Sequence, residues 1–311
     1  MLFRQIKNTA ERTTHVWSAD FGEILEMMEG EDTPTTTLDE NGREKSADSN
    51  RRYRKGFHGD TEFGKNFQSA KRLMTRGYQP KEMKGAFSDF NTQFEATESV
   101  IKMSEEGYDF DIPSLLSGDD ECWFDSLNKG DAPSIHIVFD GGANCGTDAM
   151  NFYIQSAVVN KLSELLSEEA HIKVSGTFGN IRLGKWMSGQ HKGKDISMAM
   201  YVTMKDYDEP MDLRRLGGAS HPSWLRRIMF NVWENRDGRM FGEQTGLAFG
   251  YGRAASSQDI GVTDELEKEL FESDIVLRLP APSSNYYKNV SNAVKLCKEK
   301  LAEVNAFVNQ D

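Results

Sequence analysis

Long uncharged apolar runs are absent from this sequence of 311 residues, so it contains no candidate for a membrane-spanning helix. Cysteine is scarce as well. The three residues Cys122, Cys145 and Cys297 are widely spaced, which argues against a disulfide framework and is typical of a reducing compartment. Neither cysteine nor histidine recurs at the short spacing of a zinc site. The first residues also lack the apolar segment of a signal peptide. We therefore expect a soluble, cytoplasmic protein.

The net charge of −12, from 37 Lys and Arg against 49 Asp and Glu, would repel a polyanion if it were spread evenly. The charges are instead separated along the chain. Acidic residues dominate the stretches 20–48, 95–125 and 259–274, whereas basic residues dominate 51–84, 182–194 and the surroundings of 214–227. Local patches therefore decide which partners can bind, and the total charge does not.

The N-terminal third predicts a helix and a linker. Phe21, Ile24 and Leu25 fall on one stripe behind a possible N-cap at Ser18, which predicts a helix over 19–29. The stretch 31–50 has almost no large apolar residue, so it cannot offset the entropy of ordering and predicts a mobile linker. We divide the chain into an N-terminal helical region, 1–106, with this linker and a basic-aromatic loop, and an α/β core domain, 107–311.

The clearest structural unit is a βαβ pattern. SIHIVFD (134–140) predicts a buried strand, a glycine-rich loop follows over 140–148, and 149–166 has the apolar period of a helix. HIKVSG then predicts a second strand, parallel to the first through a right-handed crossover. Further strands are expected at 196–204 and 275–279, and a helix at 287–308 that packs on the core or carries a self-association face. The expected fold class is α/β, with a mainly parallel sheet flanked by helices on both faces.

Three short patterns imitate catalytic or cofactor motifs. GDTEFGKN (59–66) resembles a phosphate-binding loop, but Asn66 replaces the magnesium-binding hydroxyl and no buried strand precedes the pattern. GYGRAA (250–255) lacks the helix that follows a dinucleotide-binding turn. Cys145 lies in a strand-to-helix loop that would lower a thiol pKa, yet no arginine or placeable histidine accompanies it. We therefore expect no enzymatic activity and no cofactor.

Oxygen-bearing side chains gather after the first strand of the βαβ unit. Asp140, Asn144 and Asp148 lie where open α/β sheets bind ligands, and hard oxygens of this kind suit magnesium or calcium. Asx residues are also the preferred caps of helix N-termini, where they satisfy free N–H groups. We favour capping, and keep the three residues as weak metal candidates only.

Basic and aromatic residues interleave in two segments of the chain. Single-stranded nucleic acid requires this mixture, because cations follow the phosphates while aromatic rings stack on unpaired bases. The alternative is a solvated charged surface with its rings anchored in the core. The candidate contacts are Arg51, Arg52, Tyr53, Arg54, Lys55, Phe57 and Lys65 in the first segment, and Arg182, Lys185, Trp186, Lys192 and Lys194 in the second.

Four landmarks, in their order, resemble a phage family. They are FGEILEMMEG near the start, FDIPSLLSGDDECWF, SIHIVFDGGANCG and HPSWLRRIMF. The core is similar to a von Willebrand A-type domain, in which the first strand ends in D-x-S-x-S and holds a metal. Here Asp140, Gly142 and Asn144 occupy those places, so two of the hydroxyl ligands are missing.

Among phage proteins, the chain resembles the Drc-type single-stranded DNA-binding cofactors with which lytic podophages recruit their own RNA polymerase. This resemblance implies cooperative, sequence-tolerant coating of single strands, formation of a homo-oligomer and contact with a phage RNA polymerase in the host cytoplasm. We accordingly expect a single-stranded DNA-binding protein of phage transcription or replication. The alternative is a non-enzymatic von Willebrand A-like interaction scaffold that binds a protein partner at the Asp140–Asp148 edge, with or without a divalent ion.

Overall fold

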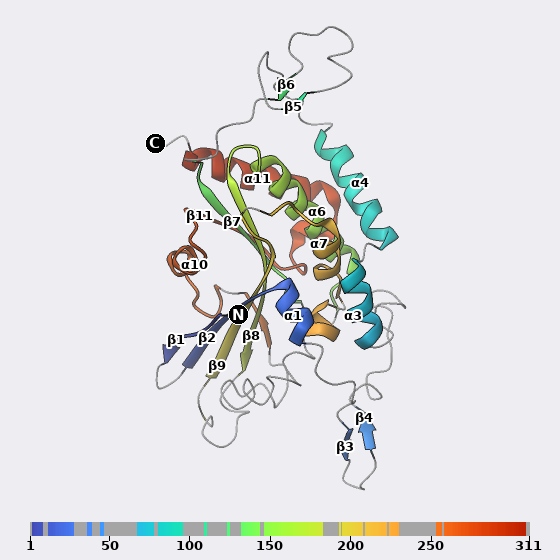
Figure 1. Ribbon diagram of the computed structural model, residues 1–311, viewed down its shortest axis with the longest axis vertical. Coiled ribbons are helices and arrows are strands. Elements are labelled where there is room, and N and C mark those ends of the chain that lie inside the picture. The colour runs from blue at the N-terminus through green and yellow to red at the C-terminus, as the bar shows by residue number, and fades with distance from the viewer. Residues whose placement is uncertain are drawn as a thin grey trace.

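The strand predicted at 134–140 lies inside a mixed sheet that organises the molecule (Figure 1). The computed structural model describes residues 2–8, 12–27, 36–38, 44–46, 67–77, 80–95, 109–110, 123–124, 132–143, 146–182, 193, 195–207, 209–222, 224–229, 253–256 and 258–308.

Seven strands form this main sheet, in the order β1-β2-β9-β8-β7-β11, with β10 beside β8. Their bounds are β1 Leu2–Asn8, β2 Arg12–Asp20, β7 Ser134–Asp140, β8 His171–Arg182, β9 Asp195–Lys205, β10 Arg253–Ala255 and β11 Ile275–Leu279. Strand β7 pairs in parallel with β8 and β11, and β2 with β9. The pairs β1–β2, β8–β9 and β8–β10 are antiparallel.

Helices cover both faces of the sheet, which confirms the predicted α/β class (Figure 1). The α-helices are α1 Phe21–Met27, α3 Phe67–Arg76, α4 Lys81–Glu95, α6 Ala149–Leu166, α7 Leu213–Ala219, α10 Asp264–Phe271 and α11 Val290–Val308. A π-helical turn, η4, spans Trp224–Met229, and a 3-10 turn, η6, spans Asn285–Lys288. Two small hairpins pair β3 (Thr36–Leu38) with β4 (Glu44–Ser46), and β5 (Asp109–Phe110) with β6 (Trp123–Phe124).

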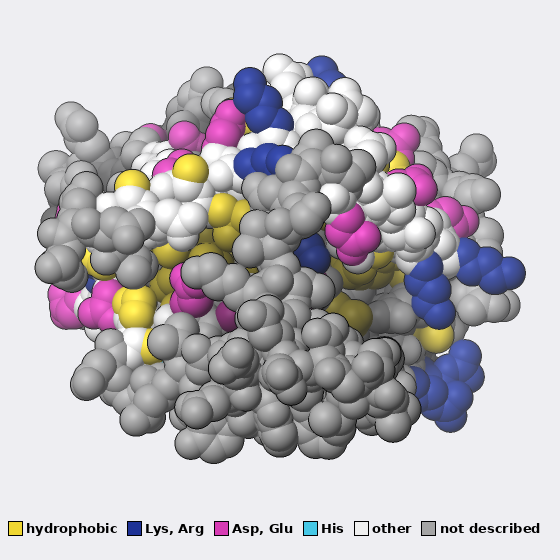
Figure 2. All heavy atoms as spheres, turned by 90° about the horizontal axis from the view of Figure 1, so that it is seen from above, with side chains coloured by type: hydrophobic (Ala, Val, Ile, Leu, Met, Phe, Trp, Pro, Cys, Tyr) yellow, Lys and Arg dark blue, Asp and Glu magenta, His cyan; other side chains and the backbone are white. Residues whose placement is uncertain are grey.

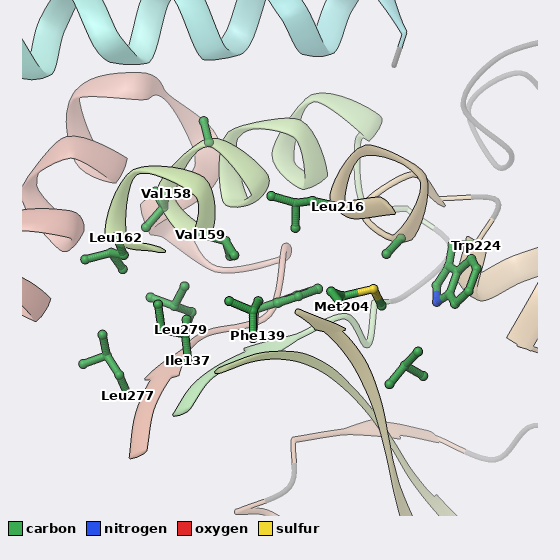
Figure 3. Packing of buried hydrophobic residues seen from close by; sticks show 14 of the residues in the cluster. Ile137, Phe139, Val158, Val159, Leu162, Met204, Leu216, Trp224, Leu277 and Leu279 are labelled. Carbon is green, nitrogen blue, oxygen red and sulfur yellow. The ribbon is translucent and has the colours of Figure 1, made fainter. Parts of the chain in front are cut away.

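Alternation along β7 assigns its side chains to two cores. Ile137 and Phe139 point toward α6, where Val158, Val159 and Leu162 lie above them (Figure 3). Val138 points the other way, into a smaller cluster with residues of β9 and α10. Helix α6 is buried almost all round because the sheet lies beneath it and α4 and α11 pack against it, as expected for a helix with few exposed charges. Helix α11 likewise packs on α4 and α6, so the predicted packing of the C-terminal helix on the core is confirmed.

The N-terminal residues join the same sheet, which the sequence did not reveal. Residues 12–20 form β2, and Ser18 lies within this strand, so the predicted N-cap at Ser18 is wrong. Asp20 caps α1 instead: its Oδ1 accepts the N–H of Glu23 at 2.7 Å, while the Glu23 carboxylate accepts the N–H of Asp20 at 3.0 Å. Phe21 then stacks on Trp224 at 5.0 Å between ring centroids, which anchors α1 against η4.

Candidate functional site

The glycine-rich turn after β7 is held closely against β8. The N–H of Gly141 donates to the carbonyl of Thr177 at 2.8 Å, which keeps the turn beside the neighbouring strand. A Cβ added at Gly141 would lie only 2.3 Å from the buried ring of Phe178, so the close approach requires glycine here. The glycine at position 141 therefore allows a tight turn directly after β7, and this turn fixes the position of Asp140 at the end of the strand.

Asp140 is buried and has one defined hydrogen bond. The N–H of Gly142 donates to its Oδ1 at 2.8 Å, and the residue is 7% exposed. Burial raises the pKa of this carboxyl from 3.8 to about 7; the Gly142 bond lowers the pKa, and the charge of Asp259 raises it further. Burial in this turn therefore favours the protonated, neutral form of the Asp140 carboxyl.

Gln155 joins the ends of β7 and β11 just below Asp140. Its side-chain amide donates to the carbonyl of Asp140 at 2.8 Å and to that of Pro280 at 2.7 Å. Asn151, one turn earlier in α6, donates to the carbonyl of Pro282 at 2.9 Å. These bonds satisfy backbone carbonyls where β7 and β11 end, and they hold α6 against this edge of the sheet.

Asp148 is the N-cap of α6, as the preferred interpretation of this loop predicted. Its carboxylate accepts the N–H of Met150 at 2.9 Å. Asn144, the third weak metal candidate, lies outside the described residues. Within the described ranges, no group of three or more His, Cys, Asp or Glu side chains is arranged to hold a metal ion. The two described aspartates thus have separate local roles, one in the turn and one at the helix start.

One nucleophile and one base do meet in the described part of the chain. His136 Nε2 and Ser175 Oγ are 2.9 Å apart. Both residues have no exposed surface, and the His136 ring packs against Phe271 with centroids 4.5 Å apart. Burial lowers the pKa of His136 to about 3, so the imidazole is neutral. A substrate could not reach this pair without unpacking α10, so we interpret it as a satisfied polar contact in the core.

The first basic-aromatic segment falls where the structure is not described. Arg51, Arg52, Tyr53, Arg54, Lys55, Phe57 and Lys65 are all outside the described residues. Helix α3 begins directly after this segment, at Phe67. It packs through Met74, which lies against the backbone of Gly218 in α7, and it exposes Arg72 and Arg76. The described structure therefore continues the basic character of the segment on the outer side of α3.

The second segment is the connection of a β-hairpin. Strands β8 and β9 are antiparallel neighbours, and the last pair before the connection joins Arg182 to Ile196. The backbone of Arg182 is the end of β8, while Lys185, Trp186, Lys192 and Lys194 lie outside the described residues. Gly193 has a φ of 81°, a left-handed conformation that favours glycine just before β9 begins. Sheet geometry thus holds both ends of this segment at one rim of the molecule.

Sequence reasoning missed two other polar sites. Arg278 of β11 forms ion pairs with buried Glu267 at 2.9 Å and with Asp264 at 2.7 Å, and Tyr201 also donates to Glu267. The only sequence signal was one arginine inside the apolar strand IVLRL. The second site is a cavity where α6 ends and β8 begins, lined by residues with no shared motif.

Comparison with protein-family models shows to which family the chain belongs. A family model described as a domain of unknown function, DUF7192, matches residues 7–305. The chain belongs to this family. The match extends from β1 into α11, so it includes the main sheet and the helices on both of its faces. Comparisons with curated proteins and with solved structures find no match. None of the described helices has the length and hydropathy required to cross a membrane.

Proposed function

We propose that this protein binds single-stranded DNA without strong sequence preference, using the β8–β9 connection together with the segment before α3. The β8–β9 connection carries this proposal. Residues 182–194 contain four Lys or Arg, one tryptophan and no acidic residue, in a chain of net charge −12. Because β8 and β9 are paired up to Arg182 and Ile196, the sheet holds both ends of this basic segment. Such a segment can follow a phosphate backbone while its ring stacks on a base.

The exposed cations of α3 support a second contact region. Arg72 and Arg76 are one helical turn apart on the solvent side of α3, next to the basic-aromatic segment that ends at Lys65. In Figure 1, α3 and the C-terminal end of β8 both lie in the lower half of the molecule. The proposal includes a role in phage transcription, as a cofactor of an RNA polymerase, and assembly into a homo-oligomer. Both rest on the resemblance of the sequence to the Drc-type cofactors.

The proposal is tested by fluorescence anisotropy with a labelled 30-nucleotide single strand and with the matching duplex, each at several salt concentrations. Replacing Lys185 and Lys192 by Ala should reduce the slope of log affinity against log salt by about 1.4, because each lost phosphate contact removes ~0.7. Trp186→Ala should weaken binding roughly five- to hundredfold with an unchanged slope, since stacking contributes about 1–3 kcal/mol per base.

The matched control replaces Lys288 and Lys295, two exposed lysines outside both segments, by Ala. This control should leave the affinity and the salt slope unchanged. Equal losses in both double variants, or duplex binding as tight as that of the single strand, would contradict the proposal. Absence of binding at low salt would also reject it.

The alternative, an interaction scaffold at the Asp140–Asp148 edge, has less support from the described residues. The carboxylate of Asp140 is buried against Gly142, and that of Asp148 caps α6. Asp140 therefore cannot meet a partner without rearrangement of the turn, whereas Asp148 is exposed but already engaged as the cap of α6. Under this alternative, Asp140→Ala would abolish binding of a protein partner, and single-stranded DNA would not bind.

A further inference from the structure

Five strands of the main sheet have one end at the same rim of the molecule. Strands β1 and β8 end there, whereas β2, β9 and β10 begin there, because the pairing register joins these ends to one another. The rim consists of residues 6–8, 12–14, 180–182, 195–197 and 253–255, and we call it the β8 rim. In Figure 1 it lies in the lower half of the molecule.

The β8 rim is basic although the chain is acidic. Its five strand ends, three residues each, contain one acid, Asp195, and four cations, Lys7, Arg12, Arg182 and Arg253. The whole chain has a net charge of −12. Figure 2 looks onto the opposite end of the molecule, where Lys, Arg, Asp and Glu side chains are interspersed on the described surface. An excess of positive charge at a rim that joins distant segments favours a polyanionic ligand.

Arg12 differs from the other arginines of the β8 rim because an acid lies opposite it. The parallel register pairs Arg12 of β2 with Asp195 of β9, and Glu11 precedes Arg12 in the sequence. Neighbouring strands are about 4.8 Å apart, so the opposite charges at this position compensate each other. The residues paired with Arg182 and Arg253 are both isoleucines. The charge of these two arginines is therefore not compensated within the paired strands.

Strand β10 brings Arg253 next to Arg182. It pairs with residues 179–181 of β8, directly beyond the stretch 171–177 that pairs with β7, so β10 takes the place of β7 beside the end of β8. Arg253 pairs with Ile181, the residue before Arg182, so the backbone positions of the two arginines are about 6 Å apart. Because successive residues of a strand alternate between its faces, the two arginines belong to opposite faces at the end of the sheet.

The pattern GYGRAA, which imitates a dinucleotide-binding turn, ends in this strand. Its last three residues form β10 instead of opening a helix. The stretch 244–258 contains no acid, and Arg253 is its one cation. A single arginine gives no local charge pattern, so only strand pairing reveals that this part of the sequence contributes to the β8 rim.

We propose that Arg182 and Arg253 together bind the phosphate backbone of single-stranded DNA where β8 ends, with one arginine on each face of the β8 rim. This inference rests on the proposed function and adds β10 to its contacts. A guanidinium binds phosphate through two parallel hydrogen bonds and stays charged at every working pH. Strand pairing fixes the backbone of both residues, so binding orders less of the chain than it does for a cation in a loop. Phosphate contacts carry no base information, which agrees with weak sequence preference.

The test measures the affinity of the full-length protein for a labelled 30-nucleotide single strand by fluorescence anisotropy, at about 50 and 200 mM salt. Loss of one phosphate contact lowers the slope of log affinity against log salt by ~0.7, which amounts to about eightfold weaker binding at 50 mM and about threefold at 200 mM. Arg253→Gln and Arg182→Gln should each show this loss, and the double variant about twice the change in slope. A poly-dT strand and a mixed sequence should give the same losses.

Two further variants separate phosphate binding from an effect on the fold. Arg12→Gln is the matched control, because it makes the same change at the same rim opposite Asp195, and it should leave the affinity and the slope unchanged. Arg253→Lys keeps the positive charge and should retain the slope, with a loss of affinity below about threefold, because lysine binds phosphate as a point charge. A partly unfolded variant loses apparent affinity without a change in slope, so the slope is the deciding measurement.

Three outcomes would overturn this inference and leave the proposed function standing. The first is that Arg253→Gln keeps the parent slope while the variant with Lys185 and Lys192 replaced loses it. The second is that Arg12→Gln loses as much slope as Arg253→Gln, which would show a general effect of positive charge. The third is that Arg253→Lys loses the same slope as Arg253→Gln, which would show that the residue acts through the fold. Absence of single-strand binding by the parent protein would reject the proposed function and this inference together.

Discussion

Gly141→Ala provides a sharp test of the tight exit from β7. The added methyl carbon would lie 2.3 Å from Cε1 of Phe178, 2.8 Å from Cζ and 3.0 Å from Cδ1, whereas carbon atoms in contact normally stay 3.5–4.0 Å apart. Phe178 is only 1% exposed, so its ring has little space into which to move. The backbone of Gly141 does not adopt a positive φ, so the expected effect is steric.

Overpacking of this kind typically costs 1–3 kcal/mol, and we expect a loss of about 2 kcal/mol in the free energy of unfolding. Gly85 in α4 is the matched control, because a Cβ added there has no atom within 4 Å. Gly85→Ala should stabilise the protein by ~0.5–1 kcal/mol, since alanine loses less backbone entropy in a helix. The same substitution of glycine by alanine should therefore destabilise the protein at position 141 and stabilise it at position 85.

Urea unfolding followed by circular dichroism measures both variants. The transition of Gly141→Ala should move to lower urea without a change in its slope, and that of Gly85→Ala should move to higher urea. If Gly141→Ala is as stable as the parent protein, the turn after β7 does not lie against Phe178 as described. The same result would remove the steric reason given for glycine in this turn.

Three further substitutions test the polar contacts. Asp140→Asn keeps an oxygen for the Gly142 N–H and removes an acid whose pKa is raised to about 7. As the pH rises from about 4 to 7, the unfolded chain loses the Asp140 proton while the folded protein keeps it, so the parent protein should lose stability relative to this variant by at most ~1.4 kcal/mol per pH unit. Parallel pH profiles of the two proteins would contradict this. Glu267→Gln leaves Arg278 without its buried counter-charge and should lower the free energy of unfolding in urea by about 3 kcal/mol. A loss below ~1 kcal/mol, the value typical of an exposed ion pair, would contradict the burial of this pair. Asp148→Ala removes the cap of α6 and should cost about 1 kcal/mol, whereas an unchanged transition would exclude its capping role.

Elements with a strong local pattern could be predicted from the sequence. The bounds of β7 and α6 agree with the expected ranges 134–140 and 149–166, because a β-branched apolar run and a long apolar period are local signals. Asp148 was identified as a cap for the same reason, since an Asx residue directly before a helical period has one common role. Strand β11 was equally recognisable from its apolar run.

Strand β2 had no comparable signal. Thr14, His15, Val16 and Trp17 are all buried, so both faces of this strand are covered and its side chains show no alternation of polar and apolar residues. Its position beside β9 depends on residues about 180 positions later in the chain. A pattern read over neighbouring residues carries no information on so distant a partner strand, and the predicted helix cap at Ser18 was wrong for this reason.

The sequence alone determined the α/β class, the βαβ unit and the two basic-aromatic segments, because composition and periodicity are properties of neighbouring residues. Tertiary structure alone decided that one of these segments connects two paired strands, that Asp140 is buried, and that Arg253 lies beside the end of β8. These features join residues from separate elements, and their energies arise from burial and contact between segments that are distant in the chain.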